Sequence, residues 1–377
     1  MTQSFEFESR HLKIAQIDLF GYDLTYAHGE YMMSGDRGAT KQQSTVVRIT
    51  TDSGVIGWGE VAPLGGTYLP TFSNGIRAAI KEVSPSLIGH DPTNTSLLQR
   101  TMDSLLLDQH AAKSAVDIAA WDIKGQAYGT PVSTLLGGTL NSDFGLYEAV
   151  SLDTPKNMVA FVRKRLAAGI ESFQLKVGNE PHIDVQRTRA ISEAIGSQAR
   201  IIADANGGWD LHDAMAATRG LEDLPVYIEQ PCRRLDDCTI VQSSSKLPLI
   251  LDECVVTLDD LFRTKYEAQA VAINIKLNRV GGLTKAALIR DTAQELGLKV
   301  SIEDTWGGDL SAAAVSHLAA STRPESLLNV SFYNDWNLEH IAGYRPRLRN
   351  GRGSAPTSPG LGVSVDSTQL VRLGSFN

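Results

Sequence analysis

After Gly137-Gly138 the sequence alternates short apolar segments with stretches of helical periodicity, and this alternation constrains the fold more than any other feature. The apolar segments span residues 146–152, 172–177, 200–205, 226–228, 249–251, 270–275, 299–302 and 327–330. The helical patterns between them include residues 155–168, 183–195, 211–221 and 283–296. Parallel strands need a crossover connection, which is usually a helix. Eight such units predict an α/β fold, a TIM-like (β/α)8 barrel.

The residues before this alternation follow another pattern. Residues 11–62 are expected to form strands, with a hairpin turn at Asp52-Ser53-Gly54. Residues 72–138 are expected to form helices, one starting at Asp91-Pro92-Thr93 and one over 111–128. Strands followed by helices predict an α+β domain.

A chain of 377 residues has room for a barrel of about 250 residues and a smaller domain. The tail is rich in Gly, Pro and Ser and has no helical period, so we expect it to pack back on the first domain. The predicted divisions are an N-terminal α+β domain over 1–138, a catalytic barrel over 139–344 and a C-terminal segment over 345–377.

Charged residues end most of the predicted barrel strands, and barrel active sites lie at this end. Asp204, Glu229 and Asp252 follow one another at steps of 25 and 23 residues, about one βα unit each. Three unpaired carboxylates at one place would repel each other, and a hard divalent cation resolves that repulsion. A single strand-end aspartate more often caps a helix or pairs with an arginine. Three in sequential register favour a magnesium or manganese site.

Two lysines indicate the type of reaction. Lys176 ends the second predicted strand and Lys276 ends the sixth, so the two face each other across the barrel axis. The proton next to a carboxylate is very weakly acidic, and the enolate formed by its removal needs concentrated positive charge. A lysine acts as a base once neighbouring cations and desolvation lower its pKa. The opposite lysine can deliver a proton from the other face or protonate a leaving group.

The order of these residues resembles the enolase superfamily, muconate lactonizing enzyme subgroup. The resemblance rests on Asp204-Ala205-Asn206, on Glu229-Gln230-Pro231 and on the segment from Lys276 to Gly282, which reads Lys-Leu-Asn-Arg-Val-Gly-Gly. It implies that the N-terminal domain caps the barrel and that a lysine works with Mg²⁺. One departure is that Gln174 stands where the subgroup usually has the first lysine of Lys-x-Lys.

The segment from Glu303 to Asp309, together with Gln174-Leu175-Lys176, resembles a branch that acts on proline derivatives. That branch includes cis-3-hydroxy-L-proline dehydratases and proline betaine epimerases, so the resemblance implies a cyclic amino acid as substrate. A dehydratase is favoured, and a racemase or epimerase of proline, proline betaine or another N-substituted amino acid is the alternative. The expected substrate contacts are Gln174, Asn206, Glu303, Asp304 and Trp306 from the barrel, with Tyr31 and Tyr68 from the capping domain.

Other readings fit the sequence less well. A metal-dependent hydrolase would want histidine ligands, and no HxH or HExxH spacing occurs. A non-catalytic metal-binding barrel would have no need of the two lysines.

The net charge of −8 disfavours nucleic-acid or anionic-membrane partners, and no apolar run is long enough to span a bilayer. Three cysteines and a polar stretch over 1–10 without a signal-peptide core favour a cytoplasmic protein. We also expect a homo-oligomer.

Overall fold

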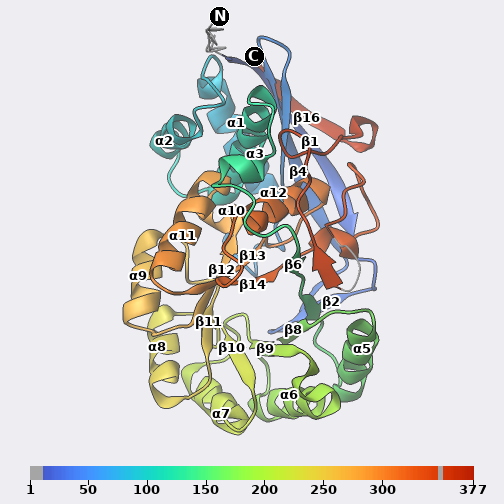
Figure 1. The fold of residues 1–377 in the computed structure, drawn as a ribbon, viewed down its shortest axis with the longest axis vertical. Helices are drawn as coiled ribbons and strands as arrows, with labels where there is room; N and C mark the ends of the chain where they lie inside the picture. The colour runs from blue at the N-terminus through green and yellow to red at the C-terminus, as the bar shows by residue number, and fades with distance from the viewer. Residues whose placement is uncertain (1–11, 347–350) are drawn as a thin grey trace, which may run out of the picture.

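The computed structural model describes residues 12–346 and 351–377 and consists of a barrel beneath an α+β cap (Figure 1). The strands are β1 (Ile14–Thr25), β2 (Tyr31–Met33), β3 (Arg37–Ala39), β4 (Lys41–Thr51), β5 (Ile56–Val61), β6 (Phe144–Gly145), β7 (Glu148–Val150), β8 (Ser172–Lys176), β9 (Arg200–Asp204), β10 (Val226–Glu229), β11 (Leu249–Leu251), β12 (Ala272–Lys276), β13 (Lys299–Glu303), β14 (Leu327–Val330), β15 (Arg352–Gly353) and β16 (Val371–Phe376). The helices are α1 (Ser73–Leu87), α2 (Thr95–Leu105), α3 (His110–Ala127), α4 (Val132–Leu135), α5 (Pro155–Ala167), α6 (Pro181–Ile195), α7 (Leu211–Leu221), α8 (Leu235–Ser244), α9 (Leu258–Tyr266), α10 (Leu277–Val280), α11 (Leu283–Glu295) and α12 (Asp309–Ala320).

The predicted barrel is confirmed. Strands β7 to β14 form one eight-stranded sheet in sequence order, and every neighbouring pair is parallel. A parallel bridge between Leu146 and Val330 joins the two ends of this sheet. The strands are almost entirely buried, as expected for a sheet covered on its outer face by helices. All eight apolar segments predicted from the sequence therefore contribute a strand.

The cap is built on a four-stranded antiparallel sheet in the order β16-β1-β4-β5. The predicted hairpin is present, since β4 and β5 pair across the turn after Thr51. Strand β16 of the C-terminal segment pairs antiparallel with β1 of the cap sheet. Residues 1–11 of the predicted first domain and 347–350 of the predicted tail lie outside the described residues.

One predicted helix start is wrong. Helix α2 begins at Thr95, where the Asn94 side chain accepts a hydrogen bond from the backbone of Leu97 at 3.2 Å. Asp91, which we expected to start this helix, instead accepts hydrogen bonds from the backbone and hydroxyl of Thr93. A side chain that satisfies its own turn in this way competes with helix initiation.

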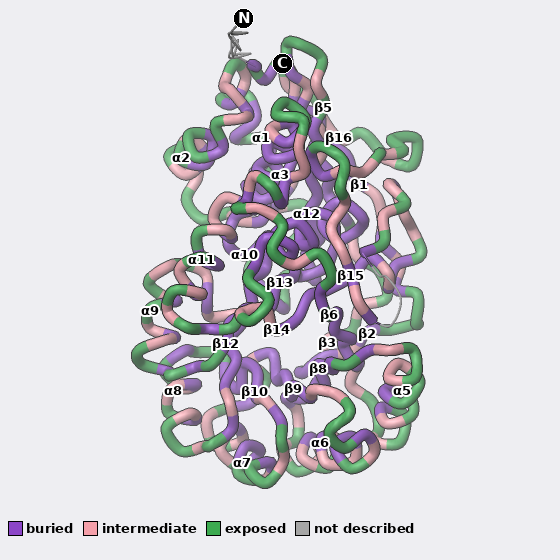
Figure 2. The backbone as a smooth tube through the Cα atoms, viewed as in Figure 1, coloured by how far each residue is buried: buried purple, intermediate pink, exposed green. Residues whose placement is uncertain are grey.

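The cap lies directly on the barrel, and the tube in Figure 2 is mostly buried where they meet. Helix α3 contacts β5 within the cap and α10 and α11 of the barrel, while β5 also contacts α12. A side chain at Gly59 would meet the backbone oxygen of Ala115 at 2.0 Å, so glycine permits β5 to lie against α3. Among the described residues, no helix combines the length and apolarity needed to cross a membrane.

Candidate active site

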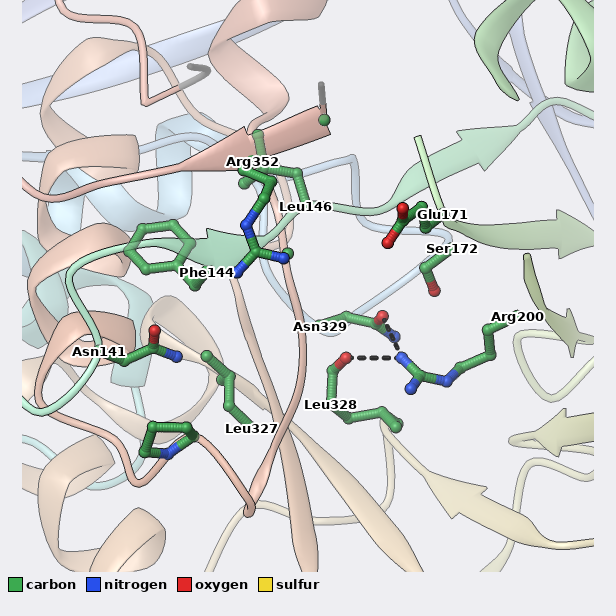
Figure 3. A pocket seen from close by; sticks show the side chains of 13 residues that line it. Asn141, Phe144, Leu146, Glu171, Ser172, Arg200, Leu327, Leu328, Asn329 and Arg352 are labelled. Carbon is green, nitrogen blue, oxygen red and sulfur yellow. Dashed lines mark hydrogen bonds between the residues drawn. The ribbon is translucent and has the colours of Figure 1, made fainter. Parts of the chain in front are cut away.

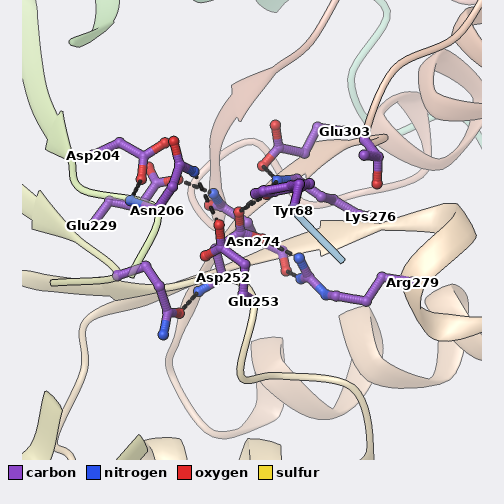
Figure 4. A network of polar contacts seen from close by, with 12 residues as sticks. Tyr68, Asp204, Asn206, Glu229, Asp252, Glu253, Asn274, Lys276, Arg279 and Glu303 are labelled. Atoms are coloured by element: carbon purple, nitrogen blue, oxygen red, sulfur yellow. Dashed lines mark hydrogen bonds and ion pairs between the residues drawn. The ribbon is translucent and has the colours of Figure 1, made fainter. Parts of the chain in front are cut away.

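The parallel strands bring the predicted polar residues together at the C-terminal end of the barrel (Figure 4). Asp204 lies opposite Lys176 on one side and opposite Glu229 on the other in the strand register. Lys276 pairs in register with Glu303. All five residues are at most 5% exposed, so their charges interact in a largely water-free interior.

Glu229 is held by two amides. Gln174 and Asn274 both donate hydrogen bonds of 2.8 Å to its Oε1 atom. Burial, followed by the charges of Asp204 and Asp252, raises the pKa of Glu229 well above its usual range. The predicted repulsion among the three carboxylates is therefore present in the folded protein.

Asp252 occupies the most cationic part of the network. Lys276 Nζ lies 2.5 Å from Asp252 Oδ2, and the Arg279 guanidinium pairs with Asp252 Oδ1. Burial alone would raise the pKa of Asp252, but Arg279 and Lys276 outweigh burial and lower it to about 2. Tyr68, from the cap, accepts a 2.5 Å hydrogen bond from Lys276.

Lys176 has the equivalent position on the other side. Its ammonium pairs with Asp204 and donates a 2.8 Å hydrogen bond to Gln174 Oε1. Burial alone would lower the pKa of both site lysines. Neighbouring carboxylates, led by Asp204 for Lys176 and Asp252 for Lys276, outweigh burial and raise both pKa values. The neighbouring carboxylates thus stabilise the ammonium form of each lysine.

Both lysines reach a single cavity between the barrel and the cap. It is lined by Tyr31, Met33, Leu64, Tyr68, Lys176, Asn206, Lys276, Thr305, Trp306 and Tyr333. Its free space is only about 10 Å³, so the cavity is nearly closed. Cap residues supply one wall, and they are mostly apolar or aromatic. The arrangement offers two opposed ammonium groups in a site from which bulk water is excluded.

Trp306 lies in an aromatic cluster at this cavity. Its ring stacks on Tyr333 at 5.6 Å and contacts Tyr31 at 5.4 Å, and its Nε1 donates a 2.9 Å hydrogen bond to Asn337. It is 2% exposed. The ring is therefore a packed wall of the cavity, and its predicted contact with a substrate stays a prediction.

The other predicted substrate contacts differ in position. Tyr31, Tyr68 and Asn206 line the cavity, whereas Gln174 lies in the carboxylate network and does not line it. Asp304 does not line the cavity either, and its Oδ1 accepts hydrogen bonds from the backbone of Thr305 and Asn278. Burial raises the pKa of Asp304 to about 7.

Glu303 lies between the cavity and a pair of tyrosines. Tyr147 and Tyr333 both donate to Glu303 Oε2, while Glu303 Oε1 lies 4.0 Å from Lys276 Nζ and has no hydrogen-bond partner. Burial raises the pKa of Glu303 above its usual value. A buried oxygen with no donor beside the lysine is available to a ligand.

Several site residues were not predicted from the sequence, and four of them contribute to the polar network. Asn274 and Arg279 had a usable signal, because Asn274 is two residues before Lys276 on the same strand face and Arg279 falls in the segment that resembles the family. Tyr147 and Tyr333 had none, since their side chains meet only through the closure of the barrel.

The residues fit a hard divalent cation. In the described part of the chain no three histidine, cysteine or acidic side chains are already gathered as metal ligands. Asp204 pairs with Lys176 and Asp252 with Lys276, whereas Glu229 accepts only from neutral amides. The donor set is nevertheless all oxygen, buried and in excess of the nearby positive charge. Asn206 Oδ1 and Glu253 Oε2 are also buried without a hydrogen-bond partner. Magnesium or manganese suits such donors.

A larger cavity of about 290 Å³ lies at the opposite end of the barrel strands (Figure 3). Residues at the starts of β8, β9 and β14 line it, and Arg200 there donates hydrogen bonds to Leu328 and Asn329. None of the predicted site residues lines this cavity. The candidate active site is therefore the smaller, closed cavity at the C-terminal ends of the strands.

The barrel and its α+β cap each match a known protein family. Residues 157–369 match the family "Enolase C-terminal domain-like", and residues 31–137 match "Mandelate racemase / muconate lactonizing enzyme, N-terminal domain". The chain is therefore an enzyme of the enolase superfamily and belongs to its mandelate racemase/muconate lactonizing enzyme family.

Individual relatives narrow the comparison. The chain is 39% identical to the cis-3-hydroxy-L-proline dehydratase of Roseibium aggregatum, over 94% of this chain and 96% of the relative. It is 27% identical to the N-succinyl-L-Arg/Lys racemase of Bacillus cereus, over 97% and 99%. A solved Roseovarius nubinhibens structure of this family, complexed with magnesium, superposes with a TM-score of 0.94 at 32% identity, covering 97% of this chain and all of that one.

Proposed function

We propose that this enzyme removes the proton next to a substrate carboxylate, with Lys176 and Lys276 acting from opposite sides. The observation that carries the proposal is that both lysines line the same closed cavity although they come from β8 and β12, four strands apart in the sheet. Acid–base transfer needs groups within hydrogen-bond reach of the reacting carbon on each face. Two opposed lysines meet that need for either outcome, reprotonation or loss of a leaving group.

Asp204, Glu229 and Asp252 would hold a divalent cation, Mg²⁺ or Mn²⁺. When bound, such an ion polarises the substrate carboxylate and stabilises the negative charge of the enolate. The raised pKa of Glu229 and the unpartnered oxygens nearby support the proposal, because both indicate more carboxylate than the protein's own cations neutralise. The magnesium in a structural relative is further support.

Dehydration of cis-3-hydroxy-L-proline is the favoured reaction. One lysine takes the proton from the α-carbon, and the bond between C3 and its hydroxyl oxygen then breaks. The opposite lysine protonates the departing hydroxyl, which leaves as water, and the enamine that remains tautomerises to a cyclic imine. The 39% identity to a dehydratase of this compound supports the choice.

Epimerisation is the second candidate. The same two lysines would remove the α-proton on one face and return a proton on the other, without a leaving group. The relative named as an N-succinyl-L-Arg/Lys racemase supports this outcome for an N-substituted amino acid. The substrate in both cases is a small carboxylate.

The deciding experiment uses proton NMR in heavy water with Mg²⁺. Incubation with cis-3-hydroxy-L-proline should convert it to a cyclic imine. Incubation with proline, proline betaine and their relatives should give α-deuterium or the opposite isomer if the enzyme is an epimerase. Lys176→Met and Lys276→Met should each lower turnover at least about 100-fold. Lys299→Met, which alters an exposed lysine at the start of β13, is the matched control.

The outcomes separate the parts of the proposal. One outcome is that the enzyme leaves every proline derivative unchanged and yet exchanges the α-proton of another amino acid for deuterium. That result would show that the proposed substrate is wrong and the reaction class right. Absence of α-exchange across a broad panel of carboxylates would overturn the reaction class itself and favour a non-catalytic metal-binding barrel.

A further inference from the structure

Two barrel helices begin without a capping side chain of their own. Helix α11 starts after Gly282 and helix α12 after Gly308, and neither glycine can offer a side-chain acceptor to the first turn. The first backbone N–H groups of a helix have no partner within the helix and need acceptors from elsewhere. Both helices follow strands that end in the active site, since β12 ends at Lys276 and β13 at Glu303.

The cap supplies the acceptors for α12. Glu60, at the end of β5, is 0% exposed and accepts hydrogen bonds of 3.1 Å from the backbone N–H groups of Gly308, Leu310 and Ser311. Two hydroxyls of the cap, on Tyr22 and Ser44, also donate to it. All these partners are donors, and the N-terminal end of a helix favours a negative charge.

The cap does the same for α11. Asp117, in the middle of α3, is 0% exposed and accepts a 2.9 Å hydrogen bond from the backbone of Thr284 and a 2.6 Å bond from its hydroxyl. A carboxylate from one domain thus takes the place of the missing N-cap in the other, at two separate helices.

Glycine is what permits each approach. A Cβ atom at Gly308 would lie 2.6 Å from Glu60 Oε1, and a Cβ atom at Gly282 would lie 2.5 Å from Asp117 Oδ2. The helices therefore could not carry their own serine or aspartate caps and still accept the cap carboxylates. A helix start of this kind can be capped by its own side chain or by a carboxylate of the other domain, but not by both. In this chain the carboxylate of the other domain caps both helices.

We propose that Glu60 and Asp117 are positioning residues of the active site, which fix the loops after β13 and β12 by capping α12 and α11 from the other domain. The loop before α12 carries Thr305 and Trp306 of the cavity, and Trp306 also forms a backbone bridge with Ala62. The segment before α11 carries Arg279, which pairs with Asp252. Neither carboxylate touches the cavity, so each acts through its loop.

The test compares Glu60→Gln and Asp117→Asn with Asp122→Asn. Asp122 is a matched control, because it is a buried carboxylate of the cap that also accepts two backbone N–H groups but holds Trp58 and Leu361 instead of an active-site helix. In Glu60→Gln and Asp122→Asn the amide must present an N–H group to at least one backbone donor, because both carboxylate oxygens accept from the backbone. Asp117→Asn removes the negative charge at the start of α11, and the amide can accept from the backbone or from the hydroxyl of Thr284 but not from both. The hydroxyls of Tyr22 and Ser44 can turn to accept from an amide at position 60, but a backbone N–H cannot.

Hydrogen–deuterium exchange and kinetics provide independent readouts. Glu60→Gln should speed exchange at residues 305–311 about tenfold or more and leave exchange at residues 283–286 unchanged. Asp117→Asn should speed exchange at residues 283–286 and leave exchange at residues 305–311 unchanged. Glu60→Gln should raise KM about tenfold with little change in kcat, because Trp306 is a cavity wall. Asp117→Asn should instead lower kcat, because its segment orients Asp252. Asp122→Asn should leave both constants within about twofold.

Faster exchange at residues 308–311 with unchanged Thr305, Trp306, KM and kcat would overturn the proposal, because the carboxylate would then be structural only. Equal effects of all three variants would also overturn it. The kinetic arm rests on the proposed function, but the exchange arm does not. An inactive wild-type enzyme would therefore contradict the function while exchange at residues 305–306 still decides the positioning role. If Glu60→Gln fails to fold, Tyr22→Phe removes one donor to Glu60 and should give the same pattern more weakly.

Discussion

Gln174 stands where the family resemblance predicts the first lysine of Lys-x-Lys, and its contacts indicate what the amide does. Its Oε1 accepts from Lys176 and its Nε2 donates to Glu229, each at 2.8 Å. Gln174→Lys would replace a neutral acceptor with a second cation beside Lys176. Like charges at close range lower the pKa of a lysine. The acidic limb of the kcat/KM profile should therefore move down by about one pH unit. An unmoved profile would show that residue 174 does not influence the base.

His317 gives a second prediction at the scale of one residue. It is 0% exposed, accepts from the backbone of Ser133 and lies 3.1 Å from the oxygen of Leu361. Burial lowers its pKa from 6.5 to about 4. The stability that this neutral imidazole contributes is complete above pH 6.5 and is lost as the pH falls towards 4, by roughly 3 kcal/mol.

The measurement is the free energy of unfolding against pH for wild type and His317→Gln. The difference between the two curves matters here, because Asp117 and Asp122 act in the opposite direction. Burial raises the pKa of each to about 6, so their contribution grows as the pH falls through 6. A variant whose curve runs parallel to that of wild type between pH 4 and 6.5 would contradict the assignment to His317.

At the scale of secondary-structure elements, we predict that β16 is dispensable for activity. It forms the edge of the cap sheet beside β1, has no buried residue and contributes one ion pair, from Arg372 to the buried Asp18. Asp18 keeps its pair with Arg48 without it. Truncation after Leu370 should lower the free energy of unfolding by roughly 2 kcal/mol and leave kcat unchanged. It should also increase self-association, because β1 becomes an exposed edge.

Size-exclusion chromatography and chemical denaturation would check this prediction, with Arg372→Ala as the control that removes the ion pair but keeps the strand. If Arg372→Ala loses as much stability as the truncation, the backbone pairing of β16 contributes nothing. A loss of activity in the truncated enzyme at a temperature where it stays folded would contradict the separation of β16 from the active site.

The elements show which parts of the structure the sequence could predict. The barrel strands were predictable because a buried parallel strand needs a continuous apolar run, and Lys176 to Lys276 could be aligned because parallel strands end at one edge. The start of α2 was not, because Asp91 and Asn94 are both good capping residues and only the turn at Thr93 distinguishes them. The roles of Glu60 and Asp117 depend on donors about 170 to 250 residues away, which no local pattern reveals.

For the molecule as a whole, the near absence of free space in the active site means that the cap must open to admit a substrate. Arg37 connects three parts of the closed form, because it donates to Ser34 and to the oxygens of Thr67 and Asn206. Arg37→Ala should weaken closure, so KM should rise by about tenfold and exchange at residues 31–37 and 64–68 should accelerate. Arg189→Ala, which removes a surface ion pair with Asp223, is the control. An unchanged KM would show that closure does not depend on Arg37.

The charge of the site as a whole leads to a prediction in which stability and metal binding change in opposite directions. Without a divalent cation, buried Glu229 faces Asp204 and Asp252, and its raised pKa means that its ionised form opposes folding near neutral pH. Glu229→Gln keeps an Oε1 atom for Gln174 and Asn274 and removes the charge, so the variant should unfold at a higher temperature than metal-free wild type. The free energy of unfolding of wild type should rise by about 2.7 kcal/mol at a Mg²⁺ concentration of about 100 times Kd, and that of the variant should hardly change. Thermal unfolding in EDTA measures the effect of the charge, and thermal unfolding in Mg²⁺ measures the effect of metal binding. A variant less stable than wild type in EDTA would contradict the charge argument, and an equal Mg²⁺ response in the two proteins would remove Glu229 from the metal site.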